Sequence, residues 1–366
     1  MYGSGNPHLA LAGHASYIYG GSERTLSSNA APSYLVPQTQ SRTMSARKSR
    51  TTGYGATRLG LLLGLVGLSA CAALGLHLVR AAEPARRAQA PLTPERRKAI
   101  VYAQYALSDW PKLGEPKAGE WLSIVAEPGQ TYEEYVGTAR NLKSDQRHTI
   151  YILPCGRMDA ATQRTVMQLG AFAQVYFGCP VSVLRPVELP KASYVHRRKQ
   201  YNAADVLTRM ARYVPDDALA VVGVTMADLY SGELEFVFGL ASLRNRVAVI
   251  ALGRYGEPGT PEFLRRTLKS FVHETGHVFG LRHCIFYACC MNGSNSLAES
   301  DSQPLHGCPL CHDKLRHALA FDPEARFEKL AAMYEELGFE SDARIVRDRL
   351  ARMRGAHAAT ATTEGP

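Results

Sequence analysis

The eleven residues HETGHVFGLRH, from His273 to His283, constrain the fold of this chain more than any other stretch. His273 and His277 are four residues apart, so one helix presents both imidazoles on the same face and one metal ion can bind both. Gly280 can adopt a positive φ, which lets the chain turn back after the helix and bring His283 to the same metal. Three neutral histidines leave the fourth position of a zinc ion open for water, as a catalytic zinc site requires.

Glu274 is the candidate catalytic residue of this pattern. It follows the first histidine and does not easily reach the same metal, but its carboxylate can hold a metal-bound water and act as general base. The helix has clear ends, because Thr260 is a suitable N-cap, Pro261 suits the first helical position and Gly280 can end it. A chance H-E-x-x-H on a surface helix is the competing interpretation, and the matching Gly280 and His283 argue against it.

The cysteines form a second cluster beside this motif. Five of the eight cysteines fall between Cys284 and Cys311, a distribution that favours metal binding over a disulfide scaffold in a chain of 366 residues. The spacing C-x4-C-x18-C-x2-C is typical of a closed, tetrahedral structural zinc site. Its ligands are Cys284, Cys289, Cys308 and Cys311. The open alternatives are a disulfide pair, or one ligand replaced by Cys290, His306 or His312.

The stretch HETGHVFGLRHCIFYACCMNGSNSLAESDSQPLHGCPLC resembles the archaemetzincins, a family of zinc metallopeptidases in the metzincin clan. That family carries H-E-x-x-H-x-x-G-x-x-H, then a cysteine, four residues, Cys-x-Met, a spacer and Cys-x-x-Cys. The resemblance is strong over 273–311 and weaker over 148–320. It implies peptide hydrolysis with an aminopeptidase-like preference for short substrates, and two zinc ions per chain, one catalytic and one structural. It also places Met291 at the Met-turn below the catalytic zinc.

From residue 99 onwards, the sequence alternates between strand and helix patterns. The expected strands are 148–156, 179–189, 217–229 and two within 235–252. The expected helices are 158–178, 202–214 and 260–280. This order predicts an α/β (α+β) domain over 99–320, metzincin-like by resemblance, in which helices, including the active-site helix, pack on a twisted mixed β-sheet. A C-terminal helical hairpin, interpreted as a structural cap, is expected over 321–354, and a disordered tail over 355–366.

The first hundred residues have a different composition. Residues 1–57, rich in Gly, Ser, Ala, Thr and Tyr, show no helix or strand period and are expected to be disordered. The uncharged run Leu59–Val79 is long enough to cross a bilayer and is bracketed by arginines, so 58–80 is predicted to be a transmembrane helix or signal anchor. Residues 81–98 form a polar linker. This organisation predicts a single-pass membrane protein.

Two alternatives remain open for the apolar run. The tetrapeptide LSAC resembles a bacterial lipobox, in which case Cys71 carries a lipid anchor after cleavage. Against this, the apolar run continues for eight residues past Cys71, where a polar tether is expected. The other alternative is a buried core helix. Met44 is a second candidate for the start of the chain, and it would leave a short basic segment before the run.

The charge is distributed unevenly between these regions. The formal net charge is +9, and the whole excess lies in residues 1–98, which contain 12 basic and 3 acidic residues. Residues 99–366 contain 30 residues of each sign, so the folded part shows no bias toward nucleic acid. The leading hypothesis is a membrane-tethered zinc peptidase that acts on peptides or proteins. The alternative is a non-catalytic zinc-binding or scaffold protein on the same fold.

Overall fold

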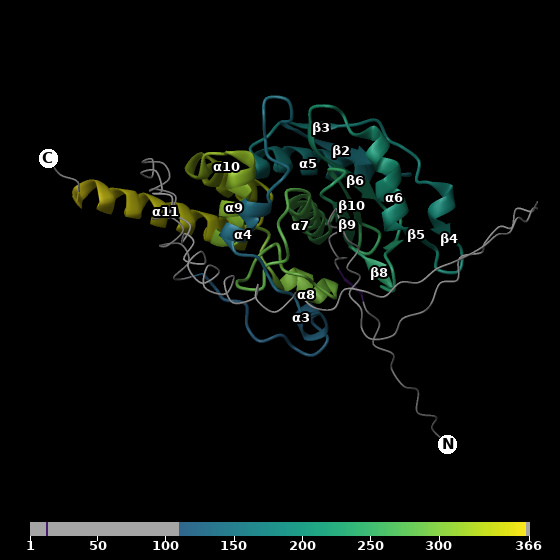
Figure 1. Cartoon of the computed structure of the whole chain (residues 1–366), viewed down its shortest axis with the longest axis horizontal. Coiled ribbons are helices and arrows are strands. Elements are labelled where there is room, and N and C mark those ends of the chain that lie inside the picture. Colours follow the sequence, from purple (N-terminus) through teal and green to yellow (C-terminus); the bar gives the residue numbers. More distant parts are fainter. Residues whose placement is uncertain (1–11, 14–109, 364–366) are drawn as a thin grey trace, which may run out of the picture. The chain divides into compact units, whose positions relative to one another are not determined.

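The computed structural model describes residues 12–13 and 110–363 (Figure 1). Its main sheet consists, in spatial order, of β3 (Val181–Val183), β2 (Thr149–Pro154), β6 (Ala218–Thr225), β10 (Val247–Ala251) and β9 (Gly239–Ser242). The first four strands run parallel, and β9 is antiparallel to β10 at the edge. The predicted mixed sheet is therefore present.

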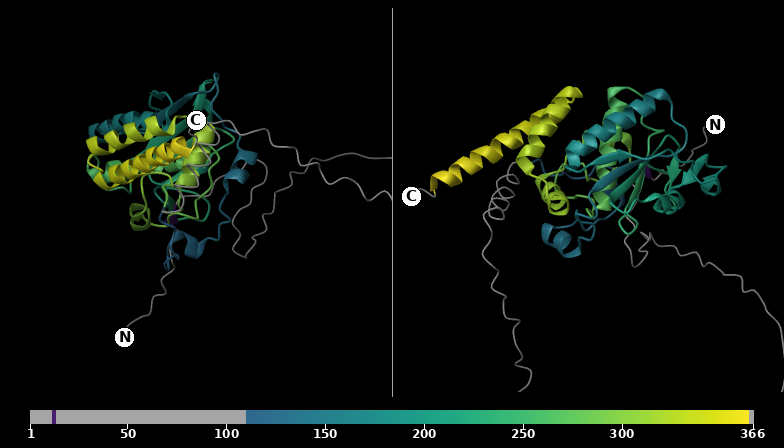
Figure 2. Two further views of the ribbon diagram at one scale, coloured as in Figure 1. Left: turned by 90° about the vertical axis from the view of Figure 1, so that its left-hand side faces the viewer. Right: turned by 90° about the horizontal axis from the view of Figure 1, so that it is seen from above.

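Helices cover both faces of this sheet (Figures 1 and 2). α5 (Ala160–Phe177) and α7 (Pro261–Val278) pack on one face, and α6 (Ala203–Met210) packs on the other. Along the central strand β6, Val222 packs in the core with α5 and α7, whereas Val221 packs in the core with α6. Every residue of β6 is buried, as expected for a parallel strand that is covered on both faces.

A second, smaller sheet is built from short strands. In spatial order they are β1 (Ala12–Gly13), β8 (Phe236–Val237), β7 (Leu229–Tyr230), β5 (Gln200–Asn202) and β4 (Tyr194–Val195). β1 pairs in parallel with β8, the strand that precedes β9 in the chain. Of the segment 1–57, for which disorder is expected, only these two residues are described, and they form a strand.

Helices α6 and α7 begin where the sequence predicts, and a side chain caps each of them. Oδ1 of Asn202 accepts a hydrogen bond from the N–H of Ala204 at 2.9 Å at the start of α6. Oγ1 of Thr260 accepts one from the N–H of Phe263 at 3.3 Å at the start of α7. By contrast, the strand expected over 179–189 is reduced to β3. A proline in the second half of that segment lacks the N–H that a longer ladder needs.

The predicted C-terminal hairpin is present, and its second helix is longer than expected. α10 (Pro323–Glu336) begins at Asp322, whose carboxylate caps it. α11 (Glu340–Thr363) follows and continues into the segment 355–366, for which a disordered tail is expected. Buried side chains of both helices join the same apolar core as α5 and α7, so the hairpin is an integral part of the domain.

Several short helices were not among the expected elements. They are α3 (Trp121–Ile124), α4 (Tyr132–Thr138), α8 (Leu297–Ser302) and α9 (Pro309–Leu319). α3 and α4 belong to a segment that precedes the main sheet. α8 lies between Cys290 and Cys308, and α9 follows Cys308. Among the candidate metal ligands, Cys308 is the N-cap of α9 and Cys311 lies in its first turn.

Within the described residues, no helix is both long enough and apolar enough to cross a membrane. The segment 58–80, predicted to be a transmembrane helix or signal anchor, lies outside the described residues, as do Cys71 and the linker 81–98. The single-pass and lipid-anchor hypotheses therefore stay predictions.

Candidate metal centres

Helix α7 presents two of the predicted histidines, and the chain turns back after it to supply the third. The Nε2 atoms of His273 and His277 are 3.0 Å apart, as their spacing along the helix predicts. Gly280 has a φ of +93°, a left-handed conformation that favours glycine and ends the helix. The returning chain brings Nε2 of His283 to 3.2 Å from Nε2 of His273.

Backbone carbonyl groups determine which ring nitrogen of His273 and His277 carries the hydrogen. Nδ1 of His273 lies 2.8 Å from the carbonyl oxygen of Cys290, and Nδ1 of His277 lies 2.7 Å from that of Leu281. A carbonyl oxygen only accepts hydrogen bonds, so each Nδ1 carries the hydrogen and each Nε2 presents its lone pair. Burial, with the charge of His283 as a further cause, lowers the pKa of His277 to about 3 and keeps this imidazole neutral.

The third histidine has a side-chain partner instead. Nδ1 of His283 donates to Oε1 of Glu127 at 2.7 Å. Burial works to raise the pKa of Glu127, but the neighbouring His283 brings it below its usual value, so the carboxylate is charged at neutral pH. The sequence gives no signal for Glu127, because it lies 156 positions from its partner.

The donor atoms of this site fit a zinc ion. The Nε2 lone pair of His273 faces those of His277 and His283 across 3.0 and 3.2 Å, which is unfavourable unless a cation lies between them. Tetrahedral Zn–N bonds of about 2.0–2.1 Å place the nitrogens about 3.3–3.4 Å apart, close to the separations found. All three histidines are buried, and they form one of two candidate metal groups among the described residues.

Glu274 is fully buried and packs against the edge strand β9. A Cβ atom on Gly239, the first residue of β9, would lie 2.5 Å from both Cγ and Oε1 of Glu274. The glutamate thus fills the space that a larger residue would take, and only the fold reveals this role of Gly239. Burial raises the pKa of Glu274 well above its usual value, a shift that a bound cation would oppose.

The four predicted cysteines also converge. Their Sγ atoms all lie within 4.8 Å of one another, and those of Cys284 and Cys308 are 3.8 Å apart. This separation is far longer than the roughly 2.05 Å of a disulfide bond. It matches the about 3.8 Å between sulfurs around a tetrahedral zinc with Zn–S bonds near 2.3 Å. The described cysteines are free thiols, so the structure contains no disulfide among them.

Backbone N–H groups point at these sulfurs. Sγ of Cys289 accepts from the N–H groups of Met291 at 3.4 Å and Cys308 at 3.2 Å. Cys308 is the N-cap of α9, and its Sγ accepts from the N–H of Cys311 at 3.5 Å. Burial opposes ionisation of Cys289, yet hydrogen bonds from the surrounding thiols bring its pKa well below the usual value. Burial and then the neighbouring thiols raise the pKa of Cys308, and a bound cation would oppose this shift.

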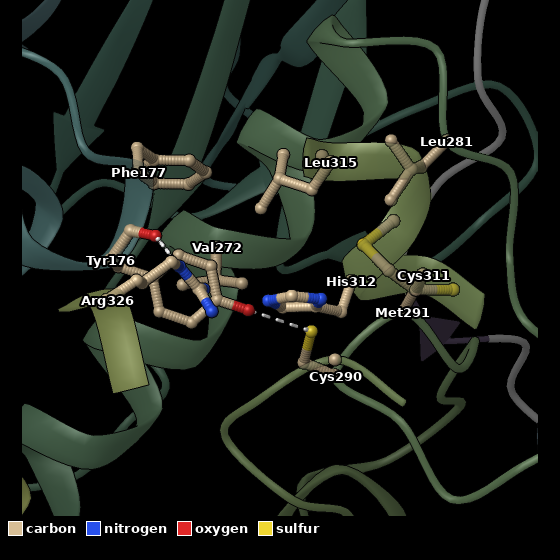
Figure 3. Close-up of a pocket in the computed structure, with 12 residues that line it drawn as sticks. Tyr176, Phe177, Val272, Leu281, Cys290, Met291, Cys311, His312, Leu315 and Arg326 are labelled. Atoms are coloured by element: carbon tan, nitrogen blue, oxygen red, sulfur yellow. Dashed lines mark hydrogen bonds between the residues drawn. The ribbon is translucent and has the colours of Figure 1, made fainter. Parts of the chain in front are cut away.

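The alternative ligands point elsewhere. Cys290 lines a small cavity, where its Sγ lies 3.6 Å from the hydroxyl of Tyr176 (Figure 3). His312 stacks on Phe327 with ring centroids 4.7 Å apart. His306 lies beside a carboxylate of α11. None of the three belongs to either candidate metal group.

The loop that follows Cys289 braces both groups. Met291 packs directly against α7, since a Cβ atom on Gly276 would lie 2.6 Å from its Sδ. Nδ2 of Asn292 donates to the carbonyl of Cys284 at 2.5 Å, and its Oδ1 accepts from the N–H of Cys289 at 2.7 Å. Asn292 is a further residue that the sequence pattern did not indicate.

The C-terminal helix α11 holds the segment that leads into the second cysteine pair. Oδ2 of Asp342 lies 3.2 Å from Nε of Arg265. Burial works to raise the pKa of Asp342, but the neighbouring His306, whose Nδ1 lies 3.6 Å from Oδ1 of Asp342, and the charge of Arg265 bring it to about 2. Nη1 of Arg349 donates to the carbonyl of Gly307 at 3.0 Å. Both Asp342 and Arg349 are buried, so the ion pair of Asp342 with Arg265 and the hydrogen bond of Arg349 to Gly307 are shielded from water.

The sequence of this chain is similar to those of known proteins. The model of Peptidase family M54 matches residues 174–317. Archaemetzincin-2 of Rattus norvegicus is 30% identical over 260 residues, which cover 59% of this chain and 72% of that protein. The archaemetzincin of Pyrococcus furiosus is 35% identical over 182 residues, which cover 47% of this chain and 95% of that protein.

Solved structures include similar proteins. The crystal structure of archaemetzincin from Archaeoglobus fulgidus, complexed with malonate, has 33% identity and a TM-score of 0.41, and the match covers 45% of this chain and 99% of that chain. From the family and its relatives, the chain is a zinc metallopeptidase that acts on peptide substrates. It belongs to the archaemetzincin family, as the resemblance of its sequence implies.

Proposed function

We propose that the chain cleaves peptide bonds at the histidine group, with His273, His277 and His283 as zinc ligands and Glu274 as general base. The observation that supports this is the convergence of three Nε2 atoms, two of them on α7, which also carries the buried carboxylate of Glu274. A zinc ion bound there supplies a Lewis acid and a water of lowered pKa. Glu274 would take the proton of the attacking water and deliver it to the leaving amine. Burial raises the pKa of Glu274, and a cation bound at the histidines would oppose that shift and favour the ionised carboxylate that a general base requires.

The second part of the proposal is a structural zinc at the four cysteines, which makes two zinc ions per chain. Four thiolates close the coordination sphere and leave no position for substrate or water. The adjacency of His283 and Cys284 in the chain, and the loop from Cys289 to Asn292, connect the two groups. The cysteine group would thereby fix the path of the chain that presents the third histidine.

A substrate peptide is proposed to lie along β9. Among the described residues, β9 pairs with β10 alone, so its other edge can align an extended peptide by β-augmentation. Residues 238–242 (FGLAS) supply the backbone groups, and Glu274 lies against Gly239, the first residue of the strand. The aminopeptidase preference is proposed from the family resemblance. Cleavage of a short peptide and of its N-acetylated form at the same rate would contradict it.

The location of the enzyme is proposed from the sequence. Residues 59–79 would tether the catalytic domain to a membrane as a single transmembrane helix, with lipidation of Cys71 as the alternative anchor. The polar segment 81–98 would then be the spacer between the membrane and the domain.

The experiment for the catalytic proposal is Glu274→Gln, with Glu262→Gln as the matched control. Glu262 is exposed in the first turn of the same helix. Glutamine has nearly the same shape but cannot take the proton, so E274Q should keep both zinc ions and lose roughly 100- to 10,000-fold in peptidase rate. E262Q should keep zinc and rate. Zinc per chain and peptide cleavage are measured on the same preparations, and an E274Q variant as fast as the parent would refute the general-base role.

A further inference from the structure

A carboxylate outside the metal-binding motif holds the third histidine. Oε1 of Glu127 lies 2.7 Å from Nδ1 of His283. Glu127 precedes the segment 174–317, which the peptidase family model matches, and it belongs to none of the patterns in the sequence. The other two histidines of the group face backbone carbonyls. The Nδ1 of His283 thus faces a carboxylate, whereas the Nδ1 atoms of the other two face carbonyl oxygens.

The indole of Trp121 fixes Glu127 in this position. Its Nε1 donates to the same Oε1 of Glu127 at 2.7 Å, and its ring meets the imidazole of His283 edge-on with centroids 5.7 Å apart. The indole also packs directly on Gly293, where a Cβ atom would overlap it. The backbone N–H of Trp121 donates to Oε1 of Glu299 on α8 at 2.9 Å. Trp121 is 2% exposed, so the indole that holds the carboxylate of Glu127 is itself buried and fixed by these contacts.

We propose that Glu127 is a positioning residue for the catalytic site. It accepts the Nδ1 hydrogen of His283, fixes the plane of the ring and increases the donor strength of Nε2 toward zinc. A charged acceptor makes a stronger hydrogen bond than a neutral one, so the charge of Glu127 contributes in addition to its shape. This inference rests on the proposed role of His283 as a zinc ligand.

Two variants separate charge from shape. Glu127→Gln retains a carbonyl oxygen at the position of Oε1 without the charge, and Glu127→Ala removes the acceptor. Glu133→Gln is the matched control, because Glu133 is exposed in the first turn of α4. Each full-length chain is titrated with a zinc chelator. A thiol-specific reagent, applied afterwards, releases the zinc that remains at the cysteines.

The zinc affinity of the histidine group should fall about tenfold in E127Q and about 100-fold in E127A. The zinc of the cysteine group, and both zinc ions of E133Q, should be released as in the parent. Cobalt(II) in place of zinc gives a second readout, because its visible absorption bands report ligand geometry. These bands should shift in E127A and stay unchanged in E133Q.

Two results would overturn this role of Glu127 while leaving the histidine site intact. One is an E127A variant with the zinc affinity of the parent. The other is an E127Q variant that matches the parent while E127A is weakened, which would leave shape alone as the contribution. A parent chain that held metal only at its cysteines would have a different meaning, since it would refute the histidine site itself and this proposal with it.

Discussion

Replacing Gly239 by alanine should displace the general base without touching a metal ligand. The new Cβ atom would lie 2.5 Å from Cγ and Oε1 of Glu274 and 2.6 Å from its Cδ. Ordinary contacts between carbon atoms lie at about 3.5–4.0 Å, so the carboxylate has to move by about 1 Å. Both residues are buried, and the shift cannot be absorbed by swinging the side chain into solvent.

A displacement of about 1 Å at a catalytic group costs on the order of 100-fold in rate. That factor corresponds to about 2.7 kcal/mol of lost transition-state stabilisation. The three histidines keep their positions on α7 and the turn after it, so the zinc content of Gly239→Ala should equal that of the parent. The assay is kcat on a fluorogenic peptide, with zinc per chain and the thermal midpoint measured on the same sample.

Gly137→Ala is the control for this experiment. Gly137 lies on α4, and a Cβ atom there would meet nothing within 4 Å. This variant should keep the parental rate and be as stable as the parent or more so, because alanine favours a helix over glycine by roughly 0.5–1 kcal/mol. A G239A variant with the parental kcat and full zinc content would refute the inferred contact with Glu274. Loss of zinc together with rate would show that the strand has moved instead.

Three further outcomes are expected. The lowered pKa of Asp342 contributes stability above pH 3.8 that is lost as the pH falls toward about 2. The difference in unfolding free energy between the parent and Asp342→Asn, about 2 kcal/mol by linkage, should therefore shrink over that range in urea titrations, and a constant difference would contradict the ion pair. Arg349→Ala loses the hydrogen bond to Gly307 and should release the cysteine-bound zinc about tenfold more readily to a chelator, whereas the exposed Arg344→Ala should not. Cys71→Ser should leave membrane association unchanged if the predicted transmembrane helix is the anchor, and release into the soluble fraction would favour the lipid anchor.

Local signals account for the parts of the fold that the sequence predicts. Thr260, Pro261 and Gly280 indicate both ends of α7, because capping depends on residues within one turn of the helix end. The histidine pattern is equally local, since its spacing follows a single helix and the turn after it. β6 shows no alternation of apolar and polar residues, because the strand is covered on both faces. Its unbroken apolar run still indicates a strand.

Features that depend on tertiary contacts were not predictable in this way. α9 begins at Cys308, where a thiol takes the place of the usual oxygen cap, and the pair Cys308 and Cys311 suggested only ligands. Glu127 reaches the site through the fold alone, and the contact between Gly239 and Glu274 also depends on tertiary structure. Asn292 bonds to three backbone groups within eight residues, but an asparagine after a methionine has no signature of its own.

The groups that accept the Nδ1 hydrogens of the three imidazoles differ in how a substitution affects them. The carbonyl groups that hold His273 and His277 belong to the main chain and survive a substitution of the residues that supply them. The carboxylate that faces His283 belongs to the side chain of Glu127, so a single substitution at residue 127 replaces it. Natural variation or engineering can therefore adjust the donor strength of a single ligand, and with it the Lewis acidity and exchange rate of the metal, while the other two ligands stay constant.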